Sequence, residues 1–319
     1  MNVASVQSYH GDRRDTARDY RTNYAFRGYT RNWYFNSDRK LPVHSEGGIM
    51  VRDDGQAMQA YGLEIEVRCY GIQNQTVLAE CCEKIIFPVF KFGAEMFKMQ
   101  NDCTIGGDTG VEIITQPCTK SRIRNDYAAY KTMFNTYFPA FNMVADSMET
   151  TCGMHVNVSN ACFGKTEEQQ VDSIRKLFYL LNKHYDFFVR ALYRDPGKTD
   201  WCGRMDYDDA RTFDIYNASG SHGNCFNMSH FREGRVEIRL VGGQKDYYCF
   251  RNTMETVFFL VDRLKALKWS DLDSLETVFK GCNQYVYKRL STECTAFLTY
   301  DQLENIRASV KEENLDLDR

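Results

Sequence analysis

The sequence predicts an α+β fold, in which helices cover one face of a curved, mostly antiparallel sheet. Four short runs carry this prediction, because apolar and polar residues alternate in each of them with the period of a β-strand. The runs are residues 62–67, 110–114, 153–159 and 235–240. Strands of parallel βαβ units are usually apolar throughout, whereas alternating strands are typical of antiparallel sheets with one covered face. Segments with helical periodicity lie between the runs and supply the covering layer.

The polar positions of these runs are expected to share one face of the sheet, since residues i and i+2 of a strand point to the same side. They are Glu64, Glu66, Glu112, His155, Asn157, Ser159, Arg235, Glu237 and Arg239. If the strands lie side by side, the opposite face is an apolar core that includes Leu63 and Ile65. Closely packed carboxylates raise one another's pKa unless cations neutralise them. The polar face therefore suits divalent metal ions and phosphate.

The other elements follow from helical periodicity, capping residues and turns. In chain order we expect a helix from Thr76 to Phe87, a strand from Phe97 to Asn101, a turn through Asp102 and residues 106–110, a helix from Ser121 to Tyr137, a long helix from Thr166 to about Tyr193, a polar loop over residues 194–223 and a helix from Phe250 to Trp269. Thr166, with Gln169 three residues later, predicts a capping box at the start of the longest helix. Further helical segments follow.

Composition divides the chain into a basic and aromatic N-terminal extension (1–55), a central domain (56–270) and a helical C-terminal tail (271–319). The net charge of −3 gives no argument for a nucleic-acid or membrane partner. No apolar run approaches the ~20 residues that cross a bilayer. The spaced arginines of the extension are partly balanced by aspartates, which favours packing on the domain or on a second subunit. Binding of nucleic acid by this extension stays open as the alternative.

The chain has twelve cysteines but no C-x-x-C pair, and Cys81 and Cys82 are adjacent, which fits no common zinc spacing. We expect reduced thiols that serve as small buried apolar groups. No secretory signal is visible at the N-terminus, so the expected location is the cytoplasm.

Four motifs occur in a fixed order along the central domain. They are Gly-x-Glu-x-Glu at 62–66, an aspartate (Asp102) ahead of Gly-Val-Glu-Ile at 110–113, Gly-Met-His-Val-x-Val at 153–158 and Val-Glu-Ile-Arg-Leu at 236–240. This order resembles the amidoligase family, which belongs to the carboxylate–amine ligases with the glutamine synthetase fold. The similarity extends over about residues 60–270. It implies a domain like the catalytic domain of glutamine synthetase.

The resemblance also implies roles for single residues. The metal ligands would be Glu64, Glu66, Glu112, His155 and Glu237, with Asp102 as an accompanying acid. ATP would contact His155, Asn157, Arg235 and Arg239. The catalytic set would be Arg239, Glu237, His155 and a middle-loop arginine, which is Arg204 or else Arg194. In glutamine synthetase a histidine commonly stands where this chain has Asn157, so that nucleotide contact is expected to differ.

The implied function is ATP-dependent amide-bond formation through an acyl phosphate, with two Mg²⁺ ions and Mn²⁺ as an alternative metal. The substrates would be a carboxylate and an amine, and the sequence leaves open a free amino acid, a peptide, a protein or a modified nucleobase. Two other functions stay open, a non-catalytic binding or structural module on the same fold and a kinase that stops at phosphorylation. A homo-oligomer is compatible with the sequence, whereas membrane and nucleic-acid partners are not expected.

Overall fold

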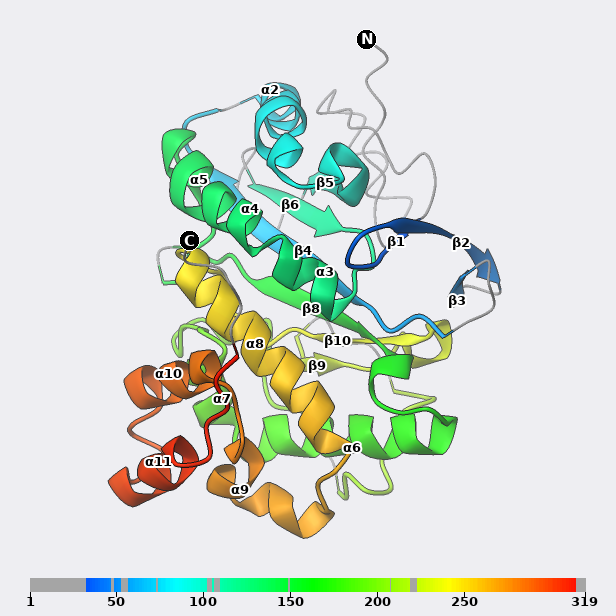
Figure 1. The fold of residues 1–319 in the computed structure, drawn as a ribbon, viewed down its shortest axis with the longest axis vertical. Coiled ribbons are helices and arrows are strands. Elements are labelled where there is room, and N and C mark those ends of the chain that lie inside the picture. Colours follow the sequence, from blue (N-terminus) through cyan, green and yellow to red (C-terminus); the bar gives the residue numbers. More distant parts are fainter. Residues whose placement is uncertain are drawn as a thin grey trace.

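The computed structural model describes residues 33–46, 49–52, 57–72, 74–101, 105, 110–148, 150–206, 208–218 and 223–313. At its centre lies a sheet (Figure 1). The strand order is β5 (Phe97–Asn101), β6 (Gly110–Thr115), β4 (Tyr61–Cys69), β8 (Met154–Ser159), β10 (Arg235–Ile238) and β9 (Phe226–Asn227), and β7 (Met143–Val144) pairs with β4. All these pairings are antiparallel. The predicted α+β class and antiparallel sheet are confirmed.

Helices cover the apolar face of this sheet. The described helical segments before the His155 strand, which include some that pack on other helices, are α2 (Gln75–Cys81), η1 (Cys82–Ile86), η2 (Phe87–Val89), η3 (Gly93–Met96), α3 (Lys120–Asn125), α4 (Tyr127–Thr132), η5 (Met133–Tyr137) and α5 (Phe138–Ala140). After it come η6 (Asn160–Cys162), α6 (Glu167–Lys183), α7 (Tyr185–Ala191), η7 (Phe231–Glu233), α8 (Tyr247–Leu264), η8 (Trp269–Asp273), α9 (Leu275–Phe279), α10 (Gln284–Glu293) and α11 (Tyr300–Arg307). Helix α8 runs across the sheet, with α3 and α4 beside it (Figure 1).

The alternation of β4 explains this layering. Leu63, Ile65 and Val67 are at most 1% exposed and belong to the main hydrophobic core. At the start of the same strand, the ring of Tyr61 packs edge-on against Phe258 of α8, with ring centroids 4.7 Å apart. Burial of these side chains fixes which face of the strand meets the helices, and so which face is left for Glu64 and Glu66.

Two predicted helices are interrupted. The helix expected from Thr166 to about Tyr193 ends at Lys183 and resumes at Tyr185, because His184 adopts a non-helical conformation and its Nε2 lies 2.9 Å from the carbonyl oxygen of Leu272. The longest helix is α8 instead. Of the two hydrogen bonds that the predicted capping box requires, one is present and the other is made to a different residue. Thr166 caps the amide of Gln169, but the Gln169 side chain accepts from the amide of Lys165.

The helix expected from Ser121 to Tyr137 is divided at Asp126, whose ψ of 6° leaves the helical range. Arg122 holds the Asp126 carboxylate there through two hydrogen bonds, one of them 2.8 Å long from Nε. A buried side-chain pair thus accompanies a one-residue break in the helix, which sequence periodicity does not reveal.

The described part of the N-terminal extension forms a second, three-stranded antiparallel sheet of β1 (Trp33–Phe35), β2 (Lys40–Glu46) and β3 (Ile49–Arg52). It joins the central domain through β1, because the amide of Phe35 donates to the carbonyl of Pro117 at 2.9 Å and the Phe35 ring is fully buried in the main core. The predicted packing of residues 1–32 lies outside the described residues.

The C-terminal helices pack into the same core as the central domain. Leu272, Val278, Phe279 and Leu290 are buried in the cluster that also contains the sheet residues. The predicted helical character of this part is present, without a separate core of its own among residues 271–313. None of the described helices combines the length and the apolar character needed to cross a membrane.

The cysteines are used as expected. Among the described residues, eleven cysteines are unpaired and all but Cys81 are buried. Burial raises the pKa of the Cys82 thiol well above its usual value, with the neighbouring thiols adding to the effect. Such thiols are poor nucleophiles, which fits packing rather than chemistry.

Candidate metal centre

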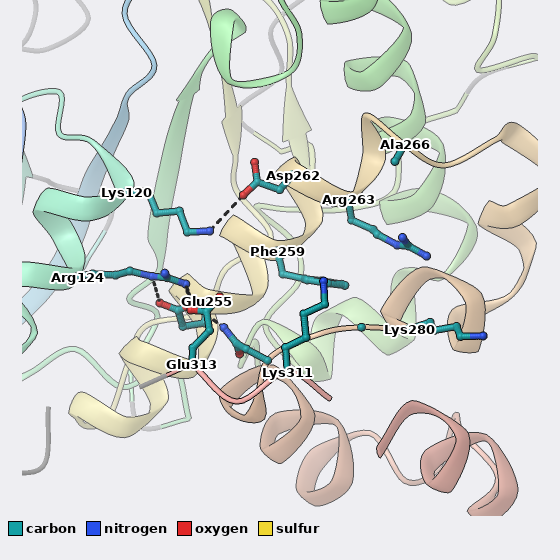
Figure 2. A pocket seen from close by; sticks show the side chains of 12 residues that line it. Lys120, Arg124, Glu255, Phe259, Asp262, Arg263, Ala266, Lys280, Lys311 and Glu313 are labelled. Atoms are coloured by element: carbon teal, nitrogen blue, oxygen red, sulfur yellow. Dashed lines mark hydrogen bonds and ion pairs between the residues drawn. The ribbon is translucent and has the colours of Figure 1, made fainter. Parts of the chain in front are cut away.

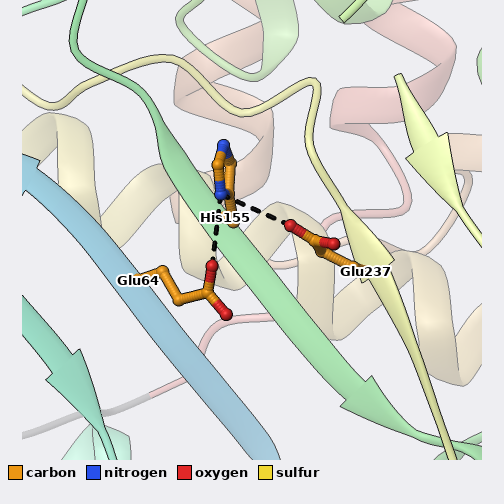
Figure 3. A group of neighbouring side chains, drawn as sticks. All are labelled: Glu64, His155 and Glu237. Atoms are coloured by element: carbon orange, nitrogen blue, oxygen red, sulfur yellow. Dashed lines mark hydrogen bonds and ion pairs between the residues drawn. The ribbon is translucent and has the colours of Figure 1, made fainter. Parts of the chain in front are cut away.

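Strand register brings the predicted metal ligands together on the polar face of the sheet. Glu66 of β4 is directly opposite Glu112 of β6, and Glu64 of β4 is directly opposite His155 of β8. Asn157 of β8 is directly opposite Glu237 of β10. Opposed residues of an antiparallel pair project to the same side and lie close together. Figure 3 shows Glu64, His155 and Glu237 converging on this face, from three neighbouring strands. These predicted residues therefore form one cluster.

The cluster consists of two ligand groups that share His155. In the first, Nδ1 of His155 lies 3.3 Å from an oxygen of Glu64 and 3.3 Å from an oxygen of Glu237. In the second, Nε2 of His155 lies 3.6 Å from an oxygen of Glu66, and Glu112 completes the group. Within each group the ligand atoms lie within 4.8 Å of one another. Each group could hold a metal ion.

The electrostatics of the cluster are those of an acid-rich site. Burial and the charge of Arg239 oppose protonation of His155, but the hydrogen bond with Glu64 and the charges of Glu66 and Glu237 outweigh them and raise the pKa of His155. Burial also opposes ionisation of Glu64, yet its contacts with His155, Arg235 and Asn157 lower its pKa to about 2. The lowered pKa keeps Glu64 in the ionised form that binds a metal, whereas an ion that binds His155 has to displace its proton.

The donor atoms fit a hard divalent ion. Carboxylate oxygens are the ligands preferred by Mg²⁺ and Mn²⁺, and a single imidazole nitrogen is compatible with both. Neighbouring side chains hold these oxygens in place. The side-chain amide of Asn157 donates to the carboxylate of Glu64 at 2.7 Å, and the side-chain amide of Asn227 donates to the carboxylate of Glu237 at 3.0 Å. Such outer contacts orient ligands and support metal affinity.

Asn227 was not predicted, since β9 is only two residues long and leaves no periodic pattern.

Lys98 was missed as well. It pairs with Ile114 in the register of β5 and β6, and Ile114 in turn pairs with Glu64, so Lys98 shares the polar face. Burial lowers the pKa of Lys98, while the charges of Glu112 and Glu64 oppose this effect. The alternation of Phe97 and Met99 with Lys98 in the sequence could have revealed it.

Two buried arginines border the cluster. Arg239 is 7% exposed and donates from Nη1 to Glu237 at 2.7 Å. Arg194 is 5% exposed, and its Nη1 donates to the carbonyl of Val241 at 3.3 Å. A side chain on Gly153 would place its Cβ 2.7 Å from Nη1 of Arg194 and 3.4 Å from Oε2 of Glu66. The guanidinium of Arg194 therefore lies against the second ligand group.

Arg204, the first choice for a catalytic arginine of the middle loop, is placed elsewhere. Its Nη2 lies 2.9 Å from Asp186, and the side chain is 53% exposed. The structure brings Arg194 rather than Arg204 to the cluster. Of the other predicted nucleotide contacts, Arg235 donates to the side-chain oxygen of Asn157 at the outer end of the cluster. Asp102 lies outside the described residues.

A cleft of about 550 Å³ lies on the helix side of the sheet (Figure 2). Its lining includes Lys120, Arg124, Glu255 and Asp262, but none of the predicted site residues. Its carboxylates are paired with cations, as Arg124 bonds Glu255 and Lys120 bonds Asp262 (Figure 2), so its described residues offer no group of acidic metal ligands like that around His155. The acid–histidine cluster is therefore the better candidate for chemistry.

Gly153→Ala is expected to weaken Mn²⁺ binding by about tenfold, because the added methyl group displaces either Arg194 or Glu66 from its position beside His155. Isothermal titration calorimetry with Mn²⁺ measures the effect. Gly62→Ala is the matched control, since a Cβ there meets only Asn157 Cβ, at an ordinary 3.6 Å. Equal affinities of the two variants would contradict the placement of Arg194 against the ligands.

No protein-family model matches the chain, and no curated protein matches it in sequence.

Proposed function

We propose that this chain is an ATP- and Mg²⁺-dependent carboxylate–amine ligase on a glutamine synthetase-like fold. One observation carries the proposal, namely that two acid–histidine ligand groups adjoin two buried arginines with spare donors. The motifs in their order along the chain, with their resemblance to the amidoligase family, agree with it. So does an antiparallel sheet with helices on its apolar face.

The arginines supply the argument for a phosphate ligand. Nε of Arg194 and Nε of Arg239 are buried and have no hydrogen-bond partner among the described residues. A buried N–H that lacks an acceptor is costly, so both donors are suited to an anion that enters the site. Carboxylates beside them would repel that anion unless divalent ions intervene. The triphosphate of ATP with its metal ions meets both requirements.

In the proposed reaction, a carboxylate oxygen of the substrate attacks the γ-phosphorus of ATP, the bond to the ADP oxygen breaks, and an acyl phosphate forms. The amine nitrogen then attacks the acyl carbon, phosphate leaves with the bonding electrons, and the nitrogen releases a proton. Bound metal ions supply charge neutralisation of the phosphate oxygens. Arg194 and Arg239 donate hydrogen bonds to the phosphoryl oxygens, and Asn157 with Arg235 contacts the nucleotide. No side chain is required as a nucleophile.

The test is ADP release from ATP and Mg²⁺ with a panel of amino acids and peptides as carboxylates and hydroxylamine as the amine. A ligase releases ADP only with its carboxylate substrate and forms a hydroxamate from it. A kinase that stops at phosphorylation would release ADP and accumulate a free phosphorylated product at the same rate when the amine is left out. A non-catalytic module would bind ATP without any ADP release. Either of these two results contradicts the proposal.

Arg194→Met is expected to lower ADP release by about 100-fold, since it removes a buried donor to the transferred phosphoryl group. Arg204→Met is expected to stay within about twofold of the unmodified chain, because Arg204 is exposed and paired with Asp186. Steady-state rates of both variants under saturating ATP make the comparison. The reverse order of effects would restore Arg204 as the catalytic arginine of the middle loop.

A further inference from the structure

The side chain of Lys198 bridges two loops beside the metal centre. Its Nζ donates to three main-chain carbonyls, those of Ser147 at 2.8 Å, Thr150 at 2.9 Å and Met148 at 3.1 Å. An ammonium group has three N–H donors, so these carbonyls use all of them. Asp195, the nearest carboxylate, lies further away at 3.6 Å. The short contacts of Lys198 are therefore with the turn that contains Ser147, Met148 and Thr150, and its ion pair with Asp195 is the longer interaction.

That turn leads directly into the metal-binding strand, since Gly153 and His155 follow it. It is joined to the loop after β10 by two backbone hydrogen bonds, from Ser147 to Gly243 and from Gly243 to Cys152, both 3.2 Å long. It is also joined to the start of the middle loop, because Oγ of Ser147 donates to the carbonyl of Tyr193 at 2.9 Å. The turn thus lies between the ligand His155 and the segment that carries Arg194.

The backbone around Arg194 fits tightly against the same loops. Tyr193 has a φ of 60°, which few non-glycine residues adopt. A Cβ on Gly242 would lie 2.0 Å from the carbonyl oxygen of Tyr193 and 2.8 Å from Cα of Arg194, so only glycine permits this approach. At the guanidinium itself, the bond from Nη1 to Val241 is long, at 3.3 Å. The Cys202 side chain also hydrogen-bonds Arg194, so the place of the guanidinium is set by its backbone together with these two contacts.

We propose that Lys198 is a positioning residue, which ties the Arg194 loop to the turn ahead of His155 and so sets the guanidinium beside the metal ligands. Without its ammonium group, the carbonyls of the turn lose their donors, and the hydrogen bond from Ser147 to Tyr193 remains as the side-chain link between the two loops. Arg194 contacts the transferred phosphoryl group only in the proposed ligase, so this role of Lys198 rests on the proposed function. Lys198 itself touches neither ligand group.

A double-mutant cycle in ADP release tests the role. Lys198→Met is expected to lower the rate by about tenfold or more, because small displacements of a catalytic group are costly. If Lys198 acts through Arg194, the double variant Lys198→Met/Arg194→Met is no slower than Arg194→Met alone. Additive losses would overturn the proposal, as would an unchanged rate in Lys198→Met. Lys198→Arg retains N–H donors and is expected to recover part of the rate, which a loss of folding alone would not produce.

Hydrogen exchange tests the role of Lys198 without requiring enzymatic turnover. In Lys198→Met, the amides of residues 147–152 and of Gly243 are expected to exchange faster, while those of α8 are unchanged. Lys183→Met is the matched control, since Lys183 is exposed and pairs with a single carboxylate, that of Asp273, at 3.2 Å. Unaltered exchange in Lys198→Met overturns the role of Lys198 alone. Faster exchange together with no ADP release from the unmodified chain overturns the proposed function alone.

Discussion

Replacing Glu237 by glutamine is expected to abolish ADP release, by at least about 100-fold, while the fold is retained. An oxygen of Glu237 lies 3.3 Å from Nδ1 of His155. The Glu237 carboxylate also accepts hydrogen bonds from Arg239 at 2.7 Å and from Asn227 at 3.0 Å. The amide keeps the shape of the side chain but removes one negative charge and one metal-binding oxygen. ADP release with Mg²⁺ and Mn²⁺ affinity by calorimetry measure the two losses separately.

The same variant is expected to melt at the same temperature as the unmodified chain, or higher, when metal is absent. Glu64, Glu66, Glu112 and Glu237 crowd one cluster, so removing one charge relieves repulsion. Added Mg²⁺ should stabilise the unmodified chain more than the variant, because binding to the folded state raises its stability. Melting curves with and without Mg²⁺ test this.

Glu66→Gln is expected to behave in the same way in the second ligand group. Glu233→Gln is the matched control, since Glu233 is half exposed, pairs with His230 at 2.9 Å and lies just before the strand of Glu237. Full activity in Glu237→Gln or Glu66→Gln would remove that residue from the ligands. A loss of activity in Glu233→Gln of similar size would show that the effect is not specific to the cluster.

The strands and their polar face could be predicted because alternation is a local property. Leu63, Ile65 and Val67 need only an apolar neighbour to fix the side on which Glu64 and Glu66 project. Pairing between strands is not local. That Glu66 faces Glu112 across β4 and β6 follows from turns and core packing, which the sequence does not state residue by residue.

Residues outside regular elements were harder to place. Arg194 and Arg204 both lie in a polar loop, and the choice between them depends on the left-handed backbone of Tyr193 and on its close approach to Gly242. Neither feature has a periodic signal. The break at His184 likewise arises from a contact with Leu272, 88 residues away. Tertiary contacts of this kind override local preference. ATP, the metal ions and ligase activity stay predictions.

Replacing Glu255 by leucine is expected to lower the free energy of unfolding by about 3–5 kcal/mol, the largest stability effect that we expect from a single substitution in this chain. Glu255 lies in α8 and is fully buried (0% exposed). Its carboxylate accepts from Arg124 at 2.8 Å, from Tyr127 at 2.7 Å and from Asn283 at 2.8 Å. Leucine would leave the phenol of Tyr127 and the amide of Asn283 without their acceptor. The partly buried guanidinium of Arg124 would keep its ion pair with Glu313 at 2.6 Å.

Urea unfolding measures the change, with Asp262→Asn as the matched control on the same helix. Asp262 pairs with Lys120 at 3.1 Å and with Lys265 at 2.7 Å, and its side chain is half exposed, so its loss should cost at most about 1 kcal/mol. Glu255 lies in α8 and lines the cleft on the helix side of the sheet, whose lining includes none of the predicted metal ligands (Figure 2). The folded fraction of Glu255→Leu should therefore bind Mn²⁺ as the unmodified chain does. Lost Mn²⁺ affinity without lost stability would mean that Glu255 acts on the site and not on the packing of α8 against α4 and the C-terminal helices.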